Sequence, residues 1–113
     1  MKKVEAIIRP ESVDAVRNAL SLAGVTGLTI TEVEGHGKQK GIVQQWRGEK
    51  YKVELLPKAK IEIVIKDSEI ERICRVIIES ARTGEIGDGK IFVTNLEQCI
   101  RIRTGETGSN AIG

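Results

Sequence analysis

The chain has 113 residues, a length that allows one domain with a modest hydrophobic core. Charged residues make up 30% of it, yet the formal net charge is only +2, so charge favours neither nucleic acid nor an anionic membrane as a partner. The chain has no bilayer-spanning apolar run, no signal-peptide pattern, and no metal-binding spacing among its two cysteines and one histidine. We therefore expect a cytosolic protein without a disulfide framework or a structural zinc site.

The first half of the chain contains a predicted strand, helix and strand. KVEAII, residues 3–8, has a short strand pattern that Pro10 ends. ESVDAVRNALSLAG, residues 11–24, predicts a helix because its larger apolar residues fall near one face and a glycine stands at its end. LTITEVE, residues 28–34, is rich in β-branched residues and predicts the next strand.

The second half repeats this order. KIEIVI, residues 60–65, resembles the first strand almost position for position, and Ser68 and Glu71 form a capping-box pattern where a helix would begin. IFVTN, residues 91–95, is the strand that follows this helix. The tandem repeat predicts a single α+β domain over residues 1–113, a ferredoxin-like βαββαβ sandwich with an antiparallel sheet and two helices on one face.

The predicted sheet has a second face that the helices would leave uncovered. Alternation along the strands gathers on it Ile7, Val33, Val64 and Phe92 together with Thr29, Thr31, Glu5 and Glu62. Because this face is half apolar, we interpret it as a subunit interface, with an ordinary mixed surface as the alternative.

A long segment, residues 35–58, separates the two halves. It contains four glycines, many charges, Trp46 and Tyr51, and its centre has no helix or strand period, although strand patterns at its ends extend a few residues into it. A loop of this length in a small domain is usually functional or disordered. An exposed Trp and Tyr at a loop tip predict a contact surface for another protein.

RTGEIGDGK, residues 82–90, looks like a phosphate-binding loop but lacks two features of a P-loop. Ile91 stands where the magnesium-binding hydroxyl residue would be. The segment also runs from a helix to a strand, so the helix dipole points its negative end at the loop. Gly84, Gly87 and Gly89 can nevertheless take positive φ and expose backbone N–H groups to an anion, with a plain β-turn as the alternative.

Basic side chains near this loop favour a phosphate site over the plain turn. Arg82 and Lys90 flank the loop, and IRIRTG contributes Arg101 and Arg103. In an extended segment these two arginines fall on the same side and could bind one polyphosphate. No catalytic set accompanies them, because the sequence has no histidine–carboxylate pair within reach, no H-E-x-x-H and no G-x-S-x-G.

Three motifs resemble the signature of the PII signal-transduction proteins. They are TGEIGDGKIFV at 83–93 with IRIRTGE at 100–106, TEVEGHGKQKG at 31–41, and YKVELLPKAKIEIV at 51–64. The resemblance extends from residue 1 to about 107, and the order of the motifs argues against chance. It implies a ferredoxin-like fold assembled as a compact homotrimer, a role in sensing nitrogen and energy status, and a long T-loop at about 37–55 between the second and third strands.

The resemblance implies that ATP or ADP binds competitively in clefts between subunits, and that 2-oxoglutarate binds when Mg²⁺-ATP is present. The phosphates would be held by a phosphate loop at about 82–90 and by a C-terminal loop, about 101–113, of the neighbouring subunit. The implied nucleotide-binding residues are Ile7, Thr29, Gly35, Gly37, Lys38, Gln39, Glu62, Val64, Gly87, Asp88, Gly89, Lys90, Arg101 and Arg103. The residues implied for 2-oxoglutarate are Gln39, Lys40, Gly41, Lys58 and Gly87. Gln39 would also complete the magnesium coordination together with ATP phosphates, which suits the preference of Mg²⁺ for phosphate and water ligands.

The resemblance also implies that the T-loop docks onto nitrogen-metabolism proteins through Trp46, Arg47 and Tyr51. An ammonium channel, a glutamine synthetase and a nitrogenase regulator remain open as targets, and a channel would recruit the protein to the inner face of the membrane. Tyr51 is available for nucleotidylation, with a partner-contacting tyrosine as the alternative. Lys38 departs from the arginine of many members, which turns a bidentate phosphate contact into a point charge, and Glu49 excludes the serine phosphorylation known in some relatives.

The expected mechanism is a ligand-coupled switch. Mg²⁺-ATP and 2-oxoglutarate would gather the base of the T-loop at Gln39 and Lys58, and ADP would release it. A small ATPase that uses the 82–90 loop is the alternative, and steady phosphate release would distinguish it. An RNA-recognition module on the same fold would need stacking aromatics on the central strands, where only Phe92 is available, so no nucleic-acid partner is expected.

Overall fold

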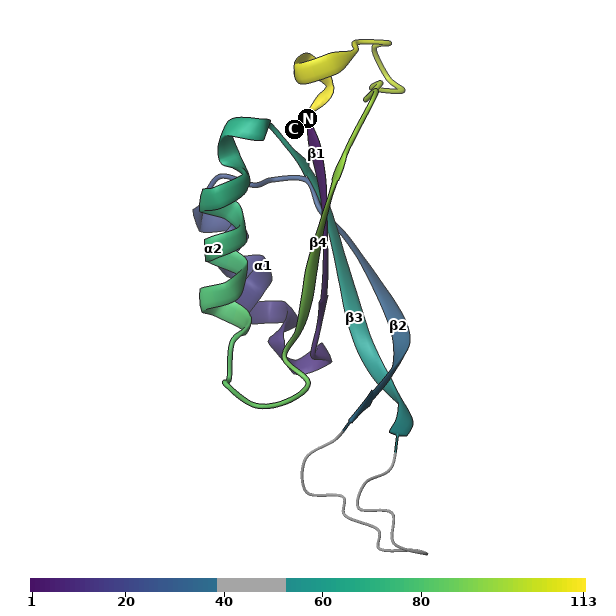
Figure 1. Ribbon diagram of the computed structural model, residues 1–113. Coiled ribbons are helices and arrows are strands. Elements are labelled where there is room, and N and C mark those ends of the chain that lie inside the picture. The colour runs from purple at the N-terminus through teal and green to yellow at the C-terminus, as the bar shows by residue number, and fades with distance from the viewer. Residues whose placement is uncertain (39–52) are drawn as a thin grey trace, which may run out of the picture.

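The computed structural model describes residues 1–38 and 53–113, with the arrangement shown in Figure 1. The four strands are β1 (Lys2–Ile8), β2 (Thr29–Lys38), β3 (Val53–Ile65) and β4 (Gly89–Asn95). The α-helices are α1 (Val13–Leu22) and α2 (Ile70–Ala81), and short 3-10 helices span Pro10–Ser12, Asp67–Glu69 and Gly108–Ala111. Within the described ranges, no helix combines the length and the apolar character that crossing a membrane requires. The order βαββαβ confirms the predicted ferredoxin-like α+β fold.

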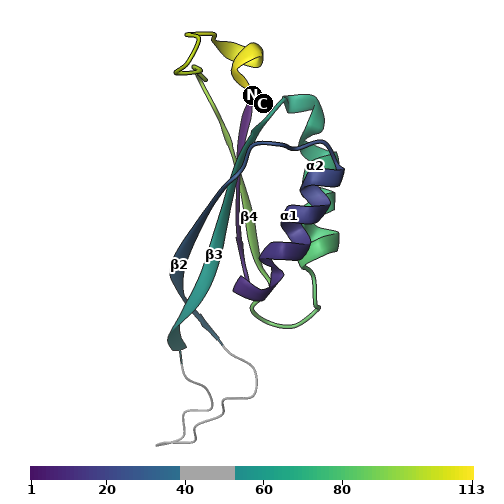
Figure 2. The ribbon, with the colours of Figure 1, turned by 180° about the vertical axis from the view of Figure 1, so that it is seen from behind.

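The sheet has the strand order β2-β3-β1-β4, and every neighbouring pair is antiparallel. Strand β1 lies in the interior, where Ile8 is opposite Ala59 of β3 on one side and Gly89 of β4 on the other. Both helices lie together on one face of the sheet, as the two opposite views in Figures 1 and 2 show. This confirms the predicted layering and leaves the other face, called here the open face, without a covering element from the described chain.

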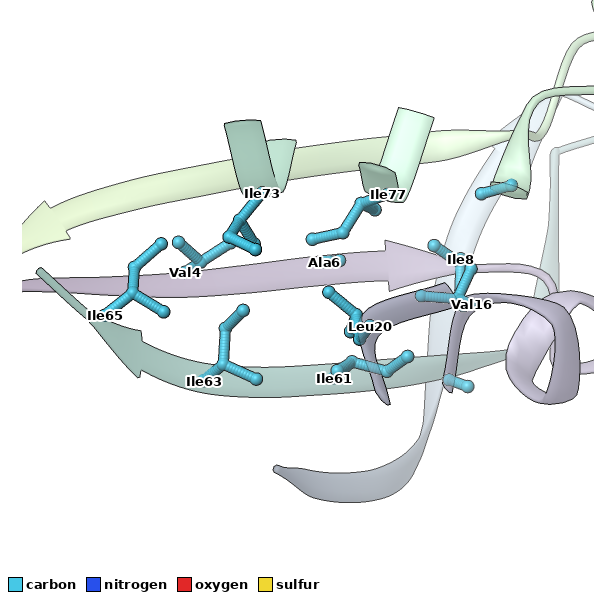
Figure 3. Close-up of a cluster of buried hydrophobic side chains, with 12 residues drawn as sticks. Val4, Ala6, Ile8, Val16, Leu20, Ile61, Ile63, Ile65, Ile73 and Ile77 are labelled. Carbon is cyan, nitrogen blue, oxygen red and sulfur yellow. The ribbon is translucent and has the colours of Figure 1, made fainter. Parts of the chain in front are cut away.

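The core lies between the helices and the central strands (Figure 3). Alternate residues of β1 and β3 point into it, and the apolar stripes of α1 and α2 close it from the other side. Its buried members are Val4, Ala6, Ile8, Val16, Leu20, Ala59, Ile61, Ile63, Ile65, Ile73, Ile77 and Ala81. All of these are aliphatic, so the described core is built without aromatic side chains, in keeping with the low aromatic content of the chain.

The predicted capping box at the start of the second helix is wrong. Ser68 lies inside a 3-10 turn, where the N–H of Glu69 donates to the carbonyl of Lys66 at 3.0 Å, and no side chain caps α2. The carboxylate of Glu69 instead accepts a hydrogen bond from Arg72 at 2.7 Å. The 3-10 turn supplies the backbone partners at this helix start, so the pairing of Ser68 with Glu71 is not needed.

Strands β2 and β3 are longer than predicted and extend into the segment assigned to the T-loop. Their ladder continues to the pair Lys38 and Val53, so residues 37–38 and 53–55 of the predicted 37–55 loop are strand. Pro57 lies within β3 opposite Glu34, although proline weakens a strand prediction. The rest of the predicted T-loop lies outside the described residues.

The strand register confirms that the predicted residues lie on the open face, but this face is less apolar than predicted. Because Val4, Ala6 and Ile8 point toward the helices, alternation places Lys3, Glu5 and Ile7 on the open face, together with the residues in register with them across the sheet. These include Thr29, Thr31, Val33, Lys58, Lys60, Glu62, Val64, Lys90, Phe92 and Thr94, so lysines interrupt the apolar side chains and the face is not half apolar. Phe92 is 49% exposed, which is unusual for a large aromatic side chain in a sheet.

Candidate functional site

The loop between α2 and β4 is organised around its own carboxylate, Asp88. The N–H groups of Thr83 and Gly84 each donate to Asp88 Oδ2 at 2.9 Å, and the Thr83 hydroxyl donates to Oδ1. These bonds hold the pKa of Asp88 well below its usual range, and the bond from the Thr83 hydroxyl has the largest effect. The prediction that Gly84 exposes its N–H to a bound anion is therefore wrong, because the loop's own anion occupies that donor.

The three glycines of the loop have the positive φ predicted for them. The φ angles are +88° at Gly84, +103° at Gly87 and +108° at Gly89. At Gly89 the backbone also passes so close to β1 that an added Cβ would lie 1.7 Å from the carbonyl oxygen of Ile7. Glycine is therefore required at this position both by its φ angle and by the contact with β1.

Two cations from distant strands bind the loop backbone. Lys58, on β3, donates to the carbonyl oxygen of Gly87 at 2.9 Å, which brings together two residues predicted to bind 2-oxoglutarate. Arg9, just after β1, donates to the carbonyl oxygen of Ile86 at 2.8 Å and reaches Asp88 Oδ1 at 3.4 Å. Arg9 was not among the predicted site residues, because nothing near it in the sequence marks a contact with a loop more than 70 positions away.

One group of predicted nucleotide residues gathers at the loop end of the sheet. Ile7 is opposite Lys90 of β4, and Gly87 and Asp88 lie just before that strand. Lys90 is exposed and forms no ion pair with the described part of the chain. Gly35, Gly37 and Lys38 follow on β2, and Gln39, Lys40, Gly41, Trp46, Arg47 and Tyr51 lie outside the described residues.

A second group lies farther along the open face. Thr29 of β2 is opposite Glu62 of β3 at the level of the middle of β1, and Val64 follows on the same face. Each oxygen of the Glu62 carboxylate is near a different ammonium group, Lys3 Nζ at 2.9 Å and Lys60 Nζ at 3.4 Å. These lysines lower the pKa of Glu62, and Lys3 has the larger effect. Glu62 is therefore an ionised hydrogen-bond acceptor on the open face at neutral pH.

The C-terminal segment follows β4, at the end of the sheet away from the 82–88 loop. Residues 102–104 form a turn, across which the N–H of Gly105 donates to the carbonyl of Arg101 at 2.8 Å. The prediction that Arg101 and Arg103 share one side of an extended segment is therefore wrong, because the chain reverses direction there. Arg101 binds Glu106, whereas Arg103 is exposed and has no ion pair with any described residue.

The 82–88 loop and the C-terminal arginines are far apart within one chain. The seven residues of β4 separate the 82–88 loop from the C-terminal segment, a length of about 20 Å in a strand. Figure 1 shows the loop and the C-terminal segment at opposite ends of the sheet. A single copy therefore does not bring Arg101 and Arg103 to the 82–90 loop.

Known proteins resemble this chain over almost its full length. A family model described as nitrogen regulatory protein P-II matches residues 1–106. The chain is 51% identical to nitrogen regulatory protein P-II 2 of Methanothermobacter thermautotrophicus, over 99% of this chain and 97% of that protein. It is 54% and 55% identical to the P-II proteins of Pasteurella multocida and Bradyrhizobium diazoefficiens, over 99% of this chain and all of each relative. The chain therefore belongs to the P-II family of nitrogen regulatory proteins, whose members are regulators and not enzymes.

Proposed function

We propose that this protein senses ATP, ADP and 2-oxoglutarate and regulates nitrogen assimilation by docking its T-loop onto target proteins. The proposal takes the ligands and the kinds of target, an ammonium channel or a glutamine synthetase, from the family. The expected cytosolic location, the single domain over residues 1–113 and the modification of Tyr51 stay predictions.

The separation of Arg101 and Arg103 from the 82–90 loop within one copy is the observation that carries this proposal. We divide the candidate residues into a loop group, which comprises Ile7, Gly35 and Gly87 to Lys90, and a distal group, which comprises Thr29, Glu62, Val64, Arg101 and Arg103. In a single copy the cations of the two groups, Lys90 and the two arginines, do not meet. A nucleotide site composed of the loop group of one copy and the distal group of the next would bring them together, and the exposed apolar side chains of the open face, such as Phe92, favour such self-association.

The side chains of each group suit the part of the nucleotide assigned to them. In the loop group, the exposed ammonium of Lys90 suits a phosphate oxygen. In the distal group, the ionised Glu62 suits the hydroxyl donors of a ribose, and the exposed guanidinium of Arg103 suits phosphates.

The proposed 2-oxoglutarate site uses Lys58 at the base of the T-loop, with Gly87. Lys58 already donates to the carbonyl of Gly87, so a dicarboxylate would recruit an ammonium that is directed toward the phosphate loop. Mg²⁺ would link this effector to the ATP phosphates, with Gln39 as the protein ligand that the family implies. The expected consequence is a different conformation at the T-loop base with ATP than with ADP, since only ATP carries the γ-phosphate.

A subunit-mixing experiment tests the shared nucleotide site. Lys90→Ala removes a cation of the loop group, and Arg103→Ala removes one of the distal group. Each pure variant should bind ATP at least about tenfold more weakly than the unmodified chain, since each loses a charge-assisted phosphate contact. The two variants are then co-expressed with different tags, and mixed oligomers are purified through both tags.

A mixed trimer contains one interface at which both groups are intact, so it should recover one tight ATP site in a calorimetric titration. Weak binding by the mixed oligomers, with mass and circular dichroism unchanged, would mean that the two groups do not share a site. Full binding by either pure variant would remove that residue from the site.

A further inference from the structure

The guanidinium of Arg101 already has two partners within its own chain. Its Nη1 donates to Glu106 Oε1 at 2.7 Å, and its Nη2 donates to the main-chain oxygen of Gly113 at 3.1 Å. A side-chain carboxylate and a main-chain oxygen therefore face the two terminal nitrogens of the guanidinium, the same pair with which arginine binds two oxygens of a phosphate.

The backbone of the C-terminal segment holds this contact in place. Arg101 N–H donates to the carbonyl of Glu106 at 2.9 Å, and Ile100 and Thr107 form an isolated antiparallel bridge beside it. The N–H of Gly108 donates to the carbonyl of Cys99 at 3.0 Å, which closes the hairpin. Glu106 thus sits across a tight turn from Arg101, and the pair forms without a long loop having to order.

Arg103, two residues away, differs from Arg101 in its exposure and its ion pairing. It is exposed and has no ion pair with a described residue, whereas the Arg101 side chain is only 27% exposed. An arriving polyanion can bind Arg103 directly. To bind Arg101 through both terminal nitrogens, it must first displace Glu106 and the main-chain oxygen of Gly113.

We propose that Glu106 is an internal competitor that occupies Arg101 and weakens nucleotide binding until a phosphate displaces it. This inference rests on the proposed function, because it assigns Arg101 to the nucleotide site. The contact between Glu106 and Arg101 is autoinhibitory. With it, the protein responds at higher nucleotide concentrations than a protein in which Arg101 has no internal partner. The competitor is a partly exposed ion pair, so its effect on affinity should be modest.

Isothermal titration of Mg²⁺-ATP into the full chain and into Glu106→Gln tests the proposal. The amide keeps the size of the side chain and removes its charge. We expect ATP to bind Glu106→Gln about two- to fivefold more tightly, the range for loss of an exposed ion pair. Glu97→Gln is the matched control, because Glu97 lies in the same segment, is exposed and forms no ion pair with the described residues. It removes the same charge and should leave the affinity unchanged.

A double-mutant cycle with Arg101→Ala shows whether the effect passes through Arg101. Arg101→Ala should weaken ATP binding, and adding Glu106→Gln to it should produce no further change. Unchanged or weaker binding by Glu106→Gln would overturn the proposal, as would an equal gain in Glu97→Gln or in the Arg101→Ala background. Failure of the unmodified chain to bind ATP would instead refute the proposed function.

Discussion

Gly89→Ala should destabilise the fold far more than the same change at a neighbouring glycine. The methyl group would lie 1.7 Å from the carbonyl oxygen of Ile7, and real Cβ contacts essentially never fall below 3.0 Å. Strands β1 and β4 would have to separate by about an ångström where Ile8 is opposite Gly89. The φ of +108° adds a conformational penalty of about 1–3 kcal/mol, and the contact adds about 1–3 kcal/mol more, so we expect a loss of about 2–6 kcal/mol.

Gly84→Ala is the matched control. Gly84 has a similar φ of +88°, but an added Cβ would meet nothing within 4 Å, so only the conformational penalty of about 1–3 kcal/mol applies. The assay is urea unfolding followed by far-ultraviolet circular dichroism, at one fixed protein concentration because the proposed self-association would make stability depend on concentration. Equal losses of free energy in the two variants would refute the argument from close approach.

Three further perturbations have defined outcomes. Asp88→Asn should lower the free energy of unfolding at pH 7. Because the pKa of Asp88 is lower in the folded than in the unfolded chain, the ionised carboxylate stabilises the fold above the unfolded pKa, about 4, and this stabilisation declines as the pH falls toward the folded pKa. In urea unfolding, the difference in free energy between Asp88→Asn and the unmodified chain should therefore be smaller at pH 3 than at pH 7. Leu20→Ala should cost about 2–5 kcal/mol in urea unfolding, while Leu22→Ala, 91% exposed on the same helix, should cost less than about 0.5 kcal/mol; similar losses would contradict the assigned core. Phe92→Glu on the open face should reduce the oligomer mass in analytical ultracentrifugation, whereas Leu22→Glu should not, and an unchanged mass for Phe92→Glu would argue against this face as the interface.

The fold could be predicted because each signal was local and repeated. The strands KVEAII and KIEIVI alternate around apolar positions that prove to be buried, and α2 has an apolar stripe of helical period. The open face followed from the same alternation. The strand ends could not be predicted in this way, because Gly35, Gly37 and Pro57 weaken a strand pattern while the ladder between β2 and β3 continues through them.

The candidate site was predicted less well, because its contacts join residues that are distant in the chain. The role of Asp88 in binding the start of its own loop depends on how the loop closes, although a threonine and an aspartate that flank a glycine-rich turn are a usable signal for it. The contact of Arg9 with Ile86 has no such signal. The prediction of an extended segment at Arg101 is wrong because an R-x-R pattern carries no information on whether the backbone reverses direction.

Calorimetric titration of 2-oxoglutarate into the purified protein tests the central claim most directly. It is performed with Mg²⁺-ATP, with Mg²⁺-ADP and without nucleotide. Binding only with Mg²⁺-ATP is the predicted result, because the effector site would be completed by a metal ion that the ATP phosphates hold. Equal binding in all three conditions, or no binding while ATP itself still binds, would contradict the account of a coupled sensor.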